Sequence, residues 1–237
     1  MASRRPSRAS PSPSVRAERG DPEGASHADT RQRLLAAAGP VFAAHGFRDA
    51  TVREICGRAG ANVAAVNYHF GDKQGLYRAV LQHGHDQGRE RFMAEVPPDG
   101  PPERRLRIWL RGFLHKALDP DRPAWLPKLM MREMTEPTTS LDDVIHSSLR
   151  PQFEQLAGIV ASLTARPVES PEVRDAAIGV IGNCLIYRLC PVVLSRMLQV
   201  EPRTQQEIDM LADSISARSL RGLRGIRASV HTEERPA

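Results

Sequence analysis

The side chains best suited to contact a ligand lie close together, between Thr51 and Phe70 and just beyond. The amide of Asn67 can donate and accept at once, which is the pattern that adenine N6 and N7 require. Arg53 suits guanine O6 and N7 in the same way. These residue types predict recognition of DNA at this stretch.

Two short helices joined by a tight turn are needed to position these groups. Thr51 and Glu54 fit a capping box at the start of the first helix, with Thr51 bonding forward and Glu54 reaching back. Gly60 suits the left-handed residue that ends this helix, and Asn62 is a good N-cap for the second. The pattern predicts a helix-turn-helix.

The second helix should present one side to the base edges. Ala64, Ala65, Tyr68 and His69 are expected to face outward, with Asn67 at their edge and Val63, Val66 and Phe70 inside. Small side chains let the backbone approach the bases, while Tyr68 and His69 suit phosphates. For Asn67 an alternative stays open, in which it bonds backbone inside the domain.

A wider string supports this prediction. Residues 30–81 read TRQRLLAAAGPVFAAHGFRDATVREICGRAGANVAAVNYHFGDKQGLYRAVL. The features FAxHGF, TVxEI, xxAGA, YHF and DKxxLY resemble the DNA-binding domain of TetR-type repressors. Gly39-Pro40 departs from the family pattern, as does Asn67, where most relatives carry Tyr.

The resemblance implies an N-terminal DNA-binding domain, a helical partner domain that binds a ligand, and a homodimer. It also implies that Lys73 grips a phosphate at a helix N-terminus. The expected DNA contacts are Thr51, Arg53, Asn62, Ala64, Ala65, Asn67, Tyr68, His69 and Lys73.

The chain divides by composition into four parts. Residues 1–28 are rich in Pro, Ser, Gly and Arg and are expected to be a disordered tail; a basic arm that contacts phosphates is the alternative. Residues 29–89 form the DNA-binding domain, with a first helix from Asp29 to Gly46 that Gly39-Pro40 should kink near 36–40. Residues 90–225 form the effector and dimerisation domain, and 226–237 a polar tail. A fourth helix should run from Asp72 to about Val96.

Beyond the break at Pro97–Pro102, every segment has helical spacing and none alternates at period two. Helices are expected over 103–118, 125–134, 140–149, 151–165, 170–200 and 204–223, so the fold class is all-α. Arg188 and Pro191 interrupt the apolar run of 170–200, which makes it too short for a membrane span.

The last two predicted helices appear more apolar than one domain can cover. Gly179 and Gly182 would allow close helix approach, so a homodimer through about 170–222 is expected, with Ile181 or Leu185 in the interface. Ordinary packing within the chain is the alternative. A dimer also suits a palindromic operator, because one short helix reads few bases.

Large and adaptable side chains in the second domain could line a pocket for a small apolar effector. The candidates are Trp109, Phe113, Trp125, Met130, Met134, His146 and Tyr187, with Met131 beside them, and most should be ordinary core.

Other functions find little support in the sequence. No phosphate loop, nucleophile elbow or HExxH helix occurs, so neither an enzyme nor a cofactor is expected. His83 and His85 lie on opposing sides of a helix, and no metal site is expected. Three cysteines without framework spacing favour a reducing cytoplasm.

The combined features predict a cytoplasmic, ligand-responsive transcriptional repressor. The net charge of +5 permits binding to nucleic acid without arguing for it. Two alternatives stay open: a redox switch that acts through Cys56 or the Cys184/Cys190 pair, and an architectural DNA binder without an effector.

Overall fold

The computed structural model of the chain describes residues 22–86, 95–119, 122–199, 202 and 204–233. Within these residues every regular element is a helix, which confirms the all-α prediction. Of the tail predicted over residues 1–28, residues 1–21 lie outside the described part of the chain.

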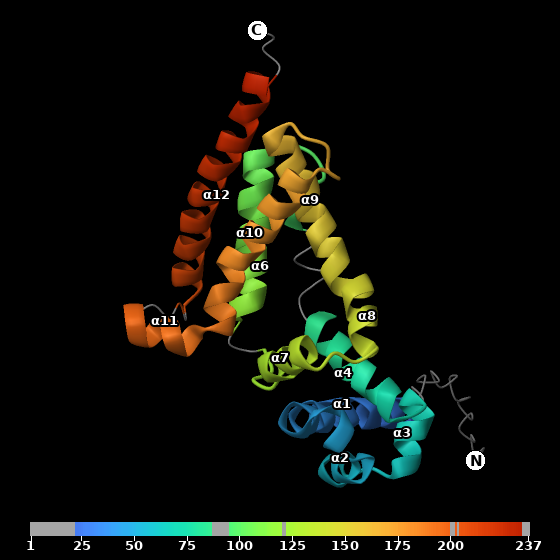
Figure 1. Cartoon of the computed structure of the whole chain (residues 1–237). Coiled ribbons are helices and arrows are strands. Elements are labelled where there is room, and N and C mark those ends of the chain that lie inside the picture. The colour runs from blue at the N-terminus through green and yellow to red at the C-terminus, as the bar shows by residue number, and fades with distance from the viewer. Residues whose placement is uncertain (1–21, 87–94, 120–121, 200–201, 203, 234–237) are drawn as a thin grey trace, which may run out of the picture.

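Four helices form the N-terminal body at the foot of the molecule (Figure 1): α1 (Pro22–Asp49), α2 (Val52–Ala59), α3 (Val63–Phe70) and α4 (Lys73–Asp86). Leu34, Val41, Ile55, Val66 and Tyr77 are among the side chains that fill its core. The predicted continuation of α4 toward Val96 crosses residues 87–94, which lie outside the described residues.

The second body consists of the helices that follow, above it in Figure 1. They are α6 (Pro102–Leu118), α7 (Leu126–Thr135), α8 (Ser140–Val144), a π-helical turn η1 (Ile145–Leu149), α9 (Arg150–Thr164), α10 (Pro171–Leu189), α11 (Pro191–Leu198) and α12 (Gln205–Glu233). The second core lies among α6, α9, α10 and α12. Leu129 of α7 and Val144 of α8 instead belong to the core of the N-terminal body, so these two helices lie at the seam.

The caps of the corner between α2 and α3 form largely as the sequence predicts. Thr51 Oγ1 accepts from the Glu54 N–H at 3.2 Å, Gly60 is left-handed at φ 60°, and Asn62 Oδ1 accepts from the Ala64 N–H at 3.1 Å. The second half of the capping box is wrong, because the Glu54 carboxylate binds Arg58 at 2.9 Å instead.

The first helix differs from its prediction in where it begins and in where its backbone breaks. It begins at Pro22, inside the segment predicted to be disordered, and its backbone stays helical through Gly39-Pro40. The break lies at Gly46, with φ 77° and ψ 176°, where the sequence predicts the helix end. Pro40 is exposed, so its ring side faces solvent. The predicted kink near 36–40 is therefore wrong in position.

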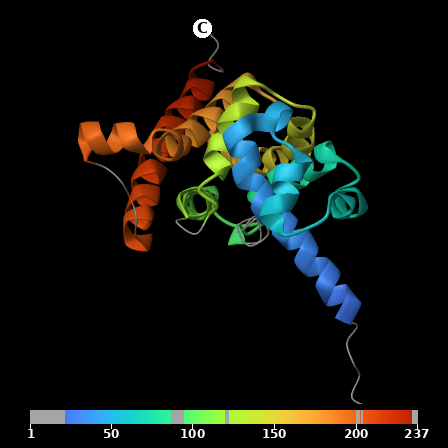
Figure 2. The same cartoon turned by 90° about the horizontal axis from the view of Figure 1, so that it is seen from below.

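The C-terminal helices also differ from the predicted limits. α12 continues to Glu233, well past 223 and into the segment expected to be a polar tail. The long apolar helix predicted over 170–200 is two helices, α10 and α11, which meet at Pro191 with a bend of 82°. Because proline cannot continue the hydrogen-bond ladder, it starts the new helix. α11 projects sideways from the body in Figure 2 and has no buried residue.

The bend also bears on membrane crossing. Among the described residues no single helix has the length and apolar composition of a membrane span, and α10 and α11 reach that composition only as a bent pair.

Candidate nucleic-acid interface and ligand cavity

α3 presents a partly polar face to solvent. Asn67 and Ala64 are exposed, Tyr68 is 74 % exposed, and His69 is half-buried. The exposed amide of Asn67 can contact a base edge, and its own backbone carbonyl accepts from the Gly71 N–H at 3.0 Å.

Two residues of α3 lie on sides other than those predicted. Ala65 is half-buried and packs against the N-terminal core, whereas Val63 is 45 % exposed. The reason is that α1, α2 and α4 all contact this two-turn helix. Three neighbours cover more than one stripe of α3, and they reach Ala65 but leave Val63, in the first turn, uncovered.

The remaining candidates for DNA contact lie around this helix. Arg53 is exposed on α2. Thr51 and Asn62 are exposed too, but their side-chain oxygens already cap α2 and α3. Both residues therefore fix the starts of α2 and α3, whatever further contact they make.

Lys73 lies at the start of α4, beside the end of α1. Its Nζ donates to the Arg48 carbonyl at 2.9 Å and lies 5.0 Å from the centre of the Phe47 ring. An ammonium has three donors, so two remain for a phosphate. Asp72 caps this helix as predicted, because its Oδ1 accepts from the Gly75 N–H at 2.7 Å.

Two glycines let α7 approach the N-terminal body closely. A Cβ on Gly39 would lie 2.2 Å from the ring of Trp125, and a Cβ on Gly84 would lie 2.4 Å from Leu126 Cδ1. Neither distance is possible between real atoms, so a side chain at Gly39 would displace the Trp125 ring and one at Gly84 would force the end of the Leu126 side chain to shift. The departure from the family pattern at Gly39 thus makes room for Trp125, the residue that precedes α7.

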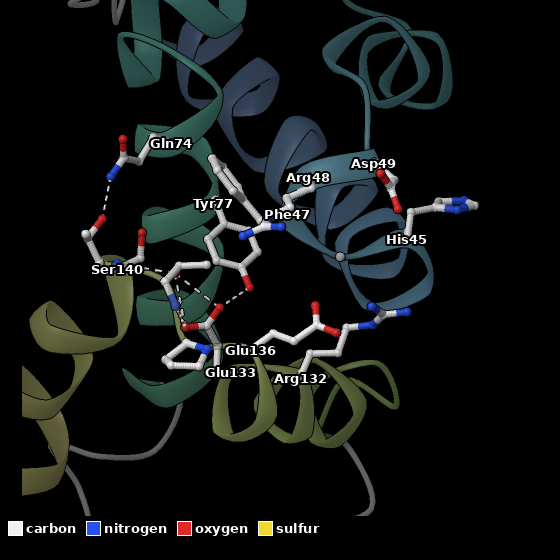
Figure 3. A pocket seen from close by; sticks show the side chains of 14 residues that line it. His45, Phe47, Arg48, Asp49, Gln74, Tyr77, Arg132, Glu133, Glu136 and Ser140 are labelled. Atoms are coloured by element: carbon white, nitrogen blue, oxygen red, sulfur yellow. Dashed lines mark hydrogen bonds between the residues drawn. The ribbon is translucent and has the colours of Figure 1, made fainter.

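The other edge of this seam is polar (Figure 3). Tyr77 of α4 donates a hydrogen bond to Glu133 of α7, whose carboxylate also accepts from the Thr138 N–H at 3.1 Å. Glu133 is 1 % exposed, and burial followed by this bond raises the pKa of Tyr77. Arg132 donates to the Ala44 carbonyl at 3.0 Å. α7 is therefore fastened to α1 and α4 along its length.

Beside these bonds lies a polar cleft of about 940 Å³. Its walls come from the end of α1 (45–49), from Gln74 and Tyr77 of α4, and from the end of α7 and the segment after it (132–133 and 136–140). The cleft separates the two bodies next to the seam.

A second, mostly apolar cavity of about 340 Å³ lies on the opposite side of α7. Its walls come from α4, α6, α7, α9 and α10. Four of the residues predicted to contact an effector line it: Trp109, Phe113, Met130 and Met134. The rings of Trp109 and Phe113 stack at 4.8 Å between centroids, which makes a flat apolar wall.

The other predicted effector contacts lie elsewhere. Trp125 packs against Gly39 at the seam, and Tyr187 packs against the second core. His146 is exposed, with its Nδ1 2.7 Å from the Asp142 carbonyl, and Met131 is 46 % exposed. Size and polarity made these residues candidates, but the direction in which each helix faces excludes them from the cavity wall.

Basic residues at the cavity were missed in the sequence. His85, Lys116, Arg122 and Arg188 all line it. The signal was present, because Arg188 interrupts the most apolar run of the chain and an unneeded charge there is costly. Burial and the nearby Lys116 and Arg122 charges lower the pKa of His85 to about 4. His85 is therefore neutral at pH 7, with Nε2 3.0 Å from the Met130 sulfur.

α10 is apolar on two sides. Val173, Ala177, Val180 and Cys184 are buried in the second core, while Ile178 and Ile186 are 56 % and 43 % exposed. Gly179 and Gly182, on the exposed side, face open space.

The two residues predicted for a dimer interface therefore do not lie on the exposed side of α10. Ile181 and Leu185 line the cavity, one step around the helix from the exposed stripe. In the described part of α12, Met210 is the large apolar side chain that is exposed, so α12 offers less apolar surface than predicted.

The cysteines are all free thiols. Cys56 and Cys184 are buried, and burial raises the pKa of both, that of Cys184 to about 12. A thiol is nucleophilic only as thiolate, so this burial disfavours redox reactivity at both positions. Cys190 is half-buried between α10 and α11. In the described ranges no three His, Cys, Asp or Glu side chains gather as a metal site.

Comparison with known proteins agrees with both bodies. Residues 34–80 match the tetR family of bacterial regulatory proteins, and residues 102–223 match the C-terminal domain of the HTH-type transcriptional dual regulator CecR. CecR of Shigella flexneri is 30 % identical over 169 residues, which are 67 % of this chain and 75 % of CecR.

More distant relatives share part of the sequence or the fold. The transcriptional repressor AcnR of Corynebacterium glutamicum is 37 % identical over 98 residues, 41 % of this chain and 46 % of AcnR. The crystal structure of AibR in complex with isovaleryl coenzyme A and operator DNA has a TM-score of 0.57 at 16 % identity. It covers 80 % of this chain and 97 % of AibR, and at that identity the likeness shows a shared fold.

Proposed function

The chain belongs to the TetR family of bacterial transcriptional regulators, and we propose that it is a repressor that a small, largely apolar ligand releases from a palindromic operator. Family members bind DNA and are not enzymes. In this proposal the protein acts in the cytoplasm as a homodimer.

The position of α7 is the observation that carries the proposal. On one side Leu126, Met130 and Met134 line the apolar cavity. On another side Leu129 is buried in the N-terminal core and Glu133 binds Tyr77. A ligand that fills the cavity must push on the helix that is fastened to the reading body. Displacement of α7 would then change the orientation of α3.

The exposed face of α3 supports contact with the major groove. Asn67 and Arg53 would read base edges, while Tyr68, His69 and Lys73 would hold phosphates. Release of DNA by a ligand then requires only that the two α3 helices of a dimer lose their spacing.

The exposed stripe of α10 supports the homodimer. Ile178, Gly179, Gly182 and Ile186 lie along one side of the helix with no covering side chain at either glycine. A stripe of this kind allows two copies of α10 to approach closely, with α12 of each subunit beside them, as in a four-helix bundle.

The names of the relatives support repression without deciding it. AcnR is named a repressor and CecR a dual regulator, and AibR was crystallised with both a ligand and operator DNA.

A footprint of the full chain on DNA upstream of its own gene tests the proposal. Two protected half-sites should appear, related by two-fold symmetry and spaced by about one helical turn, roughly 10 bp, or a multiple of it. A reporter on the same DNA should lose expression when the protein is present and regain it with ligand. Binding no tighter than to unrelated DNA at about 0.15 M salt would refute operator recognition.

A further inference from the structure

Two arginines at the apolar cavity form no ion pair within the part of the chain that the structure describes. Arg122 donates to two carbonyls, those of Gly84 at 2.7 Å and Lys116 at 3.2 Å, and its Nε is buried without a hydrogen bond. Arg188 forms no hydrogen bond or ion pair with the described residues. Both guanidinium groups line the cavity and are half-buried.

The pKa values of the two arginines show that their charged forms are unfavourable at this cavity. Burial, and after it the charge of Arg188, lower the pKa of Arg122 to about 10, while Asp119 opposes the shift. Burial also lowers the pKa of Arg188. At pH 7 both groups are still charged, so two like charges face an apolar cavity. Unpaired charge in such a place is unfavourable unless a ligand neutralises it.

We propose that the cavity binds an amphiphile with an apolar tail and an anionic head, whose head is held by Arg122 and Arg188. The inference rests on the proposed function, since it takes this cavity as the effector site. The stacked rings of Trp109 and Phe113, with Met130 and Met134, would bind the tail. The volume of about 340 Å³ lies near the lower end of ligand pockets, which favours a tail of medium length.

The geometry also gives the two arginines different tasks. Arg122 is fixed by the carbonyls of Gly84 and Lys116, and Gly84 is the glycine against which Leu126 packs. An anion that pulls on Arg122 would therefore act close to the seam between α4 and α7. Arg188 has no such attachment and is free to follow the head group.

Calorimetric titration of the full chain tests the proposal with five ten-carbon probes. They are decanoate, decyl phosphate, decanoyl coenzyme A, decanol and decylamine. The anionic probes should bind roughly tenfold tighter than decanol or more, because a charge-assisted hydrogen bond is about twice as strong as a neutral one, and protonated decylamine should bind weakest. Decanoate stronger than decanoyl coenzyme A indicates a free acid as the natural ligand; the reverse order indicates an acyl thioester.

Substitutions then locate the head group. Arg188→Gln should weaken decanoate roughly tenfold and leave decanol within about twofold, while Arg188→Lys should restore part of the loss. Arg107→Gln, an exposed arginine on α6, is the matched control and should change neither probe. Arg122→Gln should resemble Arg188→Gln; if it unfolds, the Arg188 variants still decide.

Three results would overturn the inference. They are decanol that binds as tightly as decanoate, decanoate affinity that is unchanged in Arg188→Gln, and failure of every anionic probe to bind. The proposed function fails separately: if decanol and decanoate release operator DNA equally well, the repressor stands and the anionic head does not. If the footprint shows no operator, the repressor fails whatever the titrations show.

Discussion

At the scale of single residues, Asn67 combines an exposed position with an amide that can donate and accept hydrogen bonds at once. It lies on the exposed face of α3 and replaces the Tyr that is usual at this position in the TetR family. The sequence predicted its place at the edge of that face. The sequence could not show that Ala65 is half-buried, because the sides of a two-turn helix depend on which neighbours cover it.

Asn67→Ala should relax the preference at one base pair in each half-site by about 1–3 kcal/mol, since it removes a bidentate contact to adenine. Competition binding with operators altered one base pair at a time measures this. Non-specific affinity and melting temperature should be unchanged. A lower melting temperature with the preference intact would show that Asn67 serves the fold instead.

Lys73→Ala should weaken binding to all DNA sequences alike and reduce the slope of log K against log salt by roughly one per subunit. The control is Lys128→Ala, an exposed lysine on α7 outside the reading body, which should leave the slope unchanged. The variant also loses the hydrogen bond from Lys73 to the Arg48 carbonyl. If the variant loses sequence preference and not salt dependence, Lys73 does not contact a phosphate.

His85 should lower the free energy of unfolding as the pH falls below 6.5. Burial, Lys116 and Arg122 lower its pKa to about 4, against a small opposing effect of Asp86. The unfolded chain takes up a proton near pH 6.5 but the folded chain does not, so stability is full above 6.5 and falls between 6.5 and about 4.

The loss attributable to His85 is about 3 kcal/mol. Denaturant unfolding of His85→Gln across this range should show a flatter profile than the wild type. His146→Gln, which changes an exposed histidine away from the cavity, should keep the wild-type profile. An unchanged slope in His85→Gln would assign the acid sensitivity to other groups.

At the scale of elements, α7 decides how the two bodies are joined. Its approximate limits were predictable, since Trp125, Leu126, Leu129 and Met130 repeat at helical spacing. The sequence did not show which side faces which body. Local geometry at Gly39-Pro40 predicts a kink, because it contains no sign of the Trp125 ring, which comes from a distant part of the chain and packs against Gly39.

Gly39→Ala and Gly84→Ala should each displace α7 from the N-terminal body, because the added methyl groups overlap Trp125 and Leu126. Each should lower stability by about 1–3 kcal/mol, as overpacking does. The ligand response in a DNA-release assay should weaken as well.

Gly57→Ala is the matched control, since a Cβ there meets no atom within 4 Å. It lies inside α2 and should raise helix stability by up to about 1 kcal/mol without changing the ligand response. If Gly39→Ala stabilises the chain in the same way, the proposed seating of α7 is wrong.

At the scale of the whole molecule, the sequence located the helix-turn-helix, the all-α class and an apolar C-terminal region. Regular spacing and caps made these accessible, because both depend on near neighbours in the chain. The cavity and its arginines depend on helices far apart in sequence, from His85 to Arg188. Spacing alone could not bring those residues together or separate the two apolar sides of α10.

Ile178→Glu and Ile186→Glu should each separate a dimer into monomers, because an unpaired charge in an apolar interface costs several kcal/mol. Light scattering at micromolar concentration should show half the wild-type mass. Val168→Glu, which alters an exposed apolar residue outside the stripe, should remain dimeric. A wild-type chain that is already monomeric at this concentration would contradict the assembly itself.

The two glycines beneath α7 also set a condition for building chimeric biosensors. Such sensors join the DNA-binding body of one regulator to the sensing body of another. Here the graft would fit without repacking in an N-terminal body that has glycine at the positions of Gly39 and Gly84, because Trp125 and Leu126 come with the sensing body. A donor with alanine at either position would need a smaller residue in return, so compatibility between modules depends on two matched pairs.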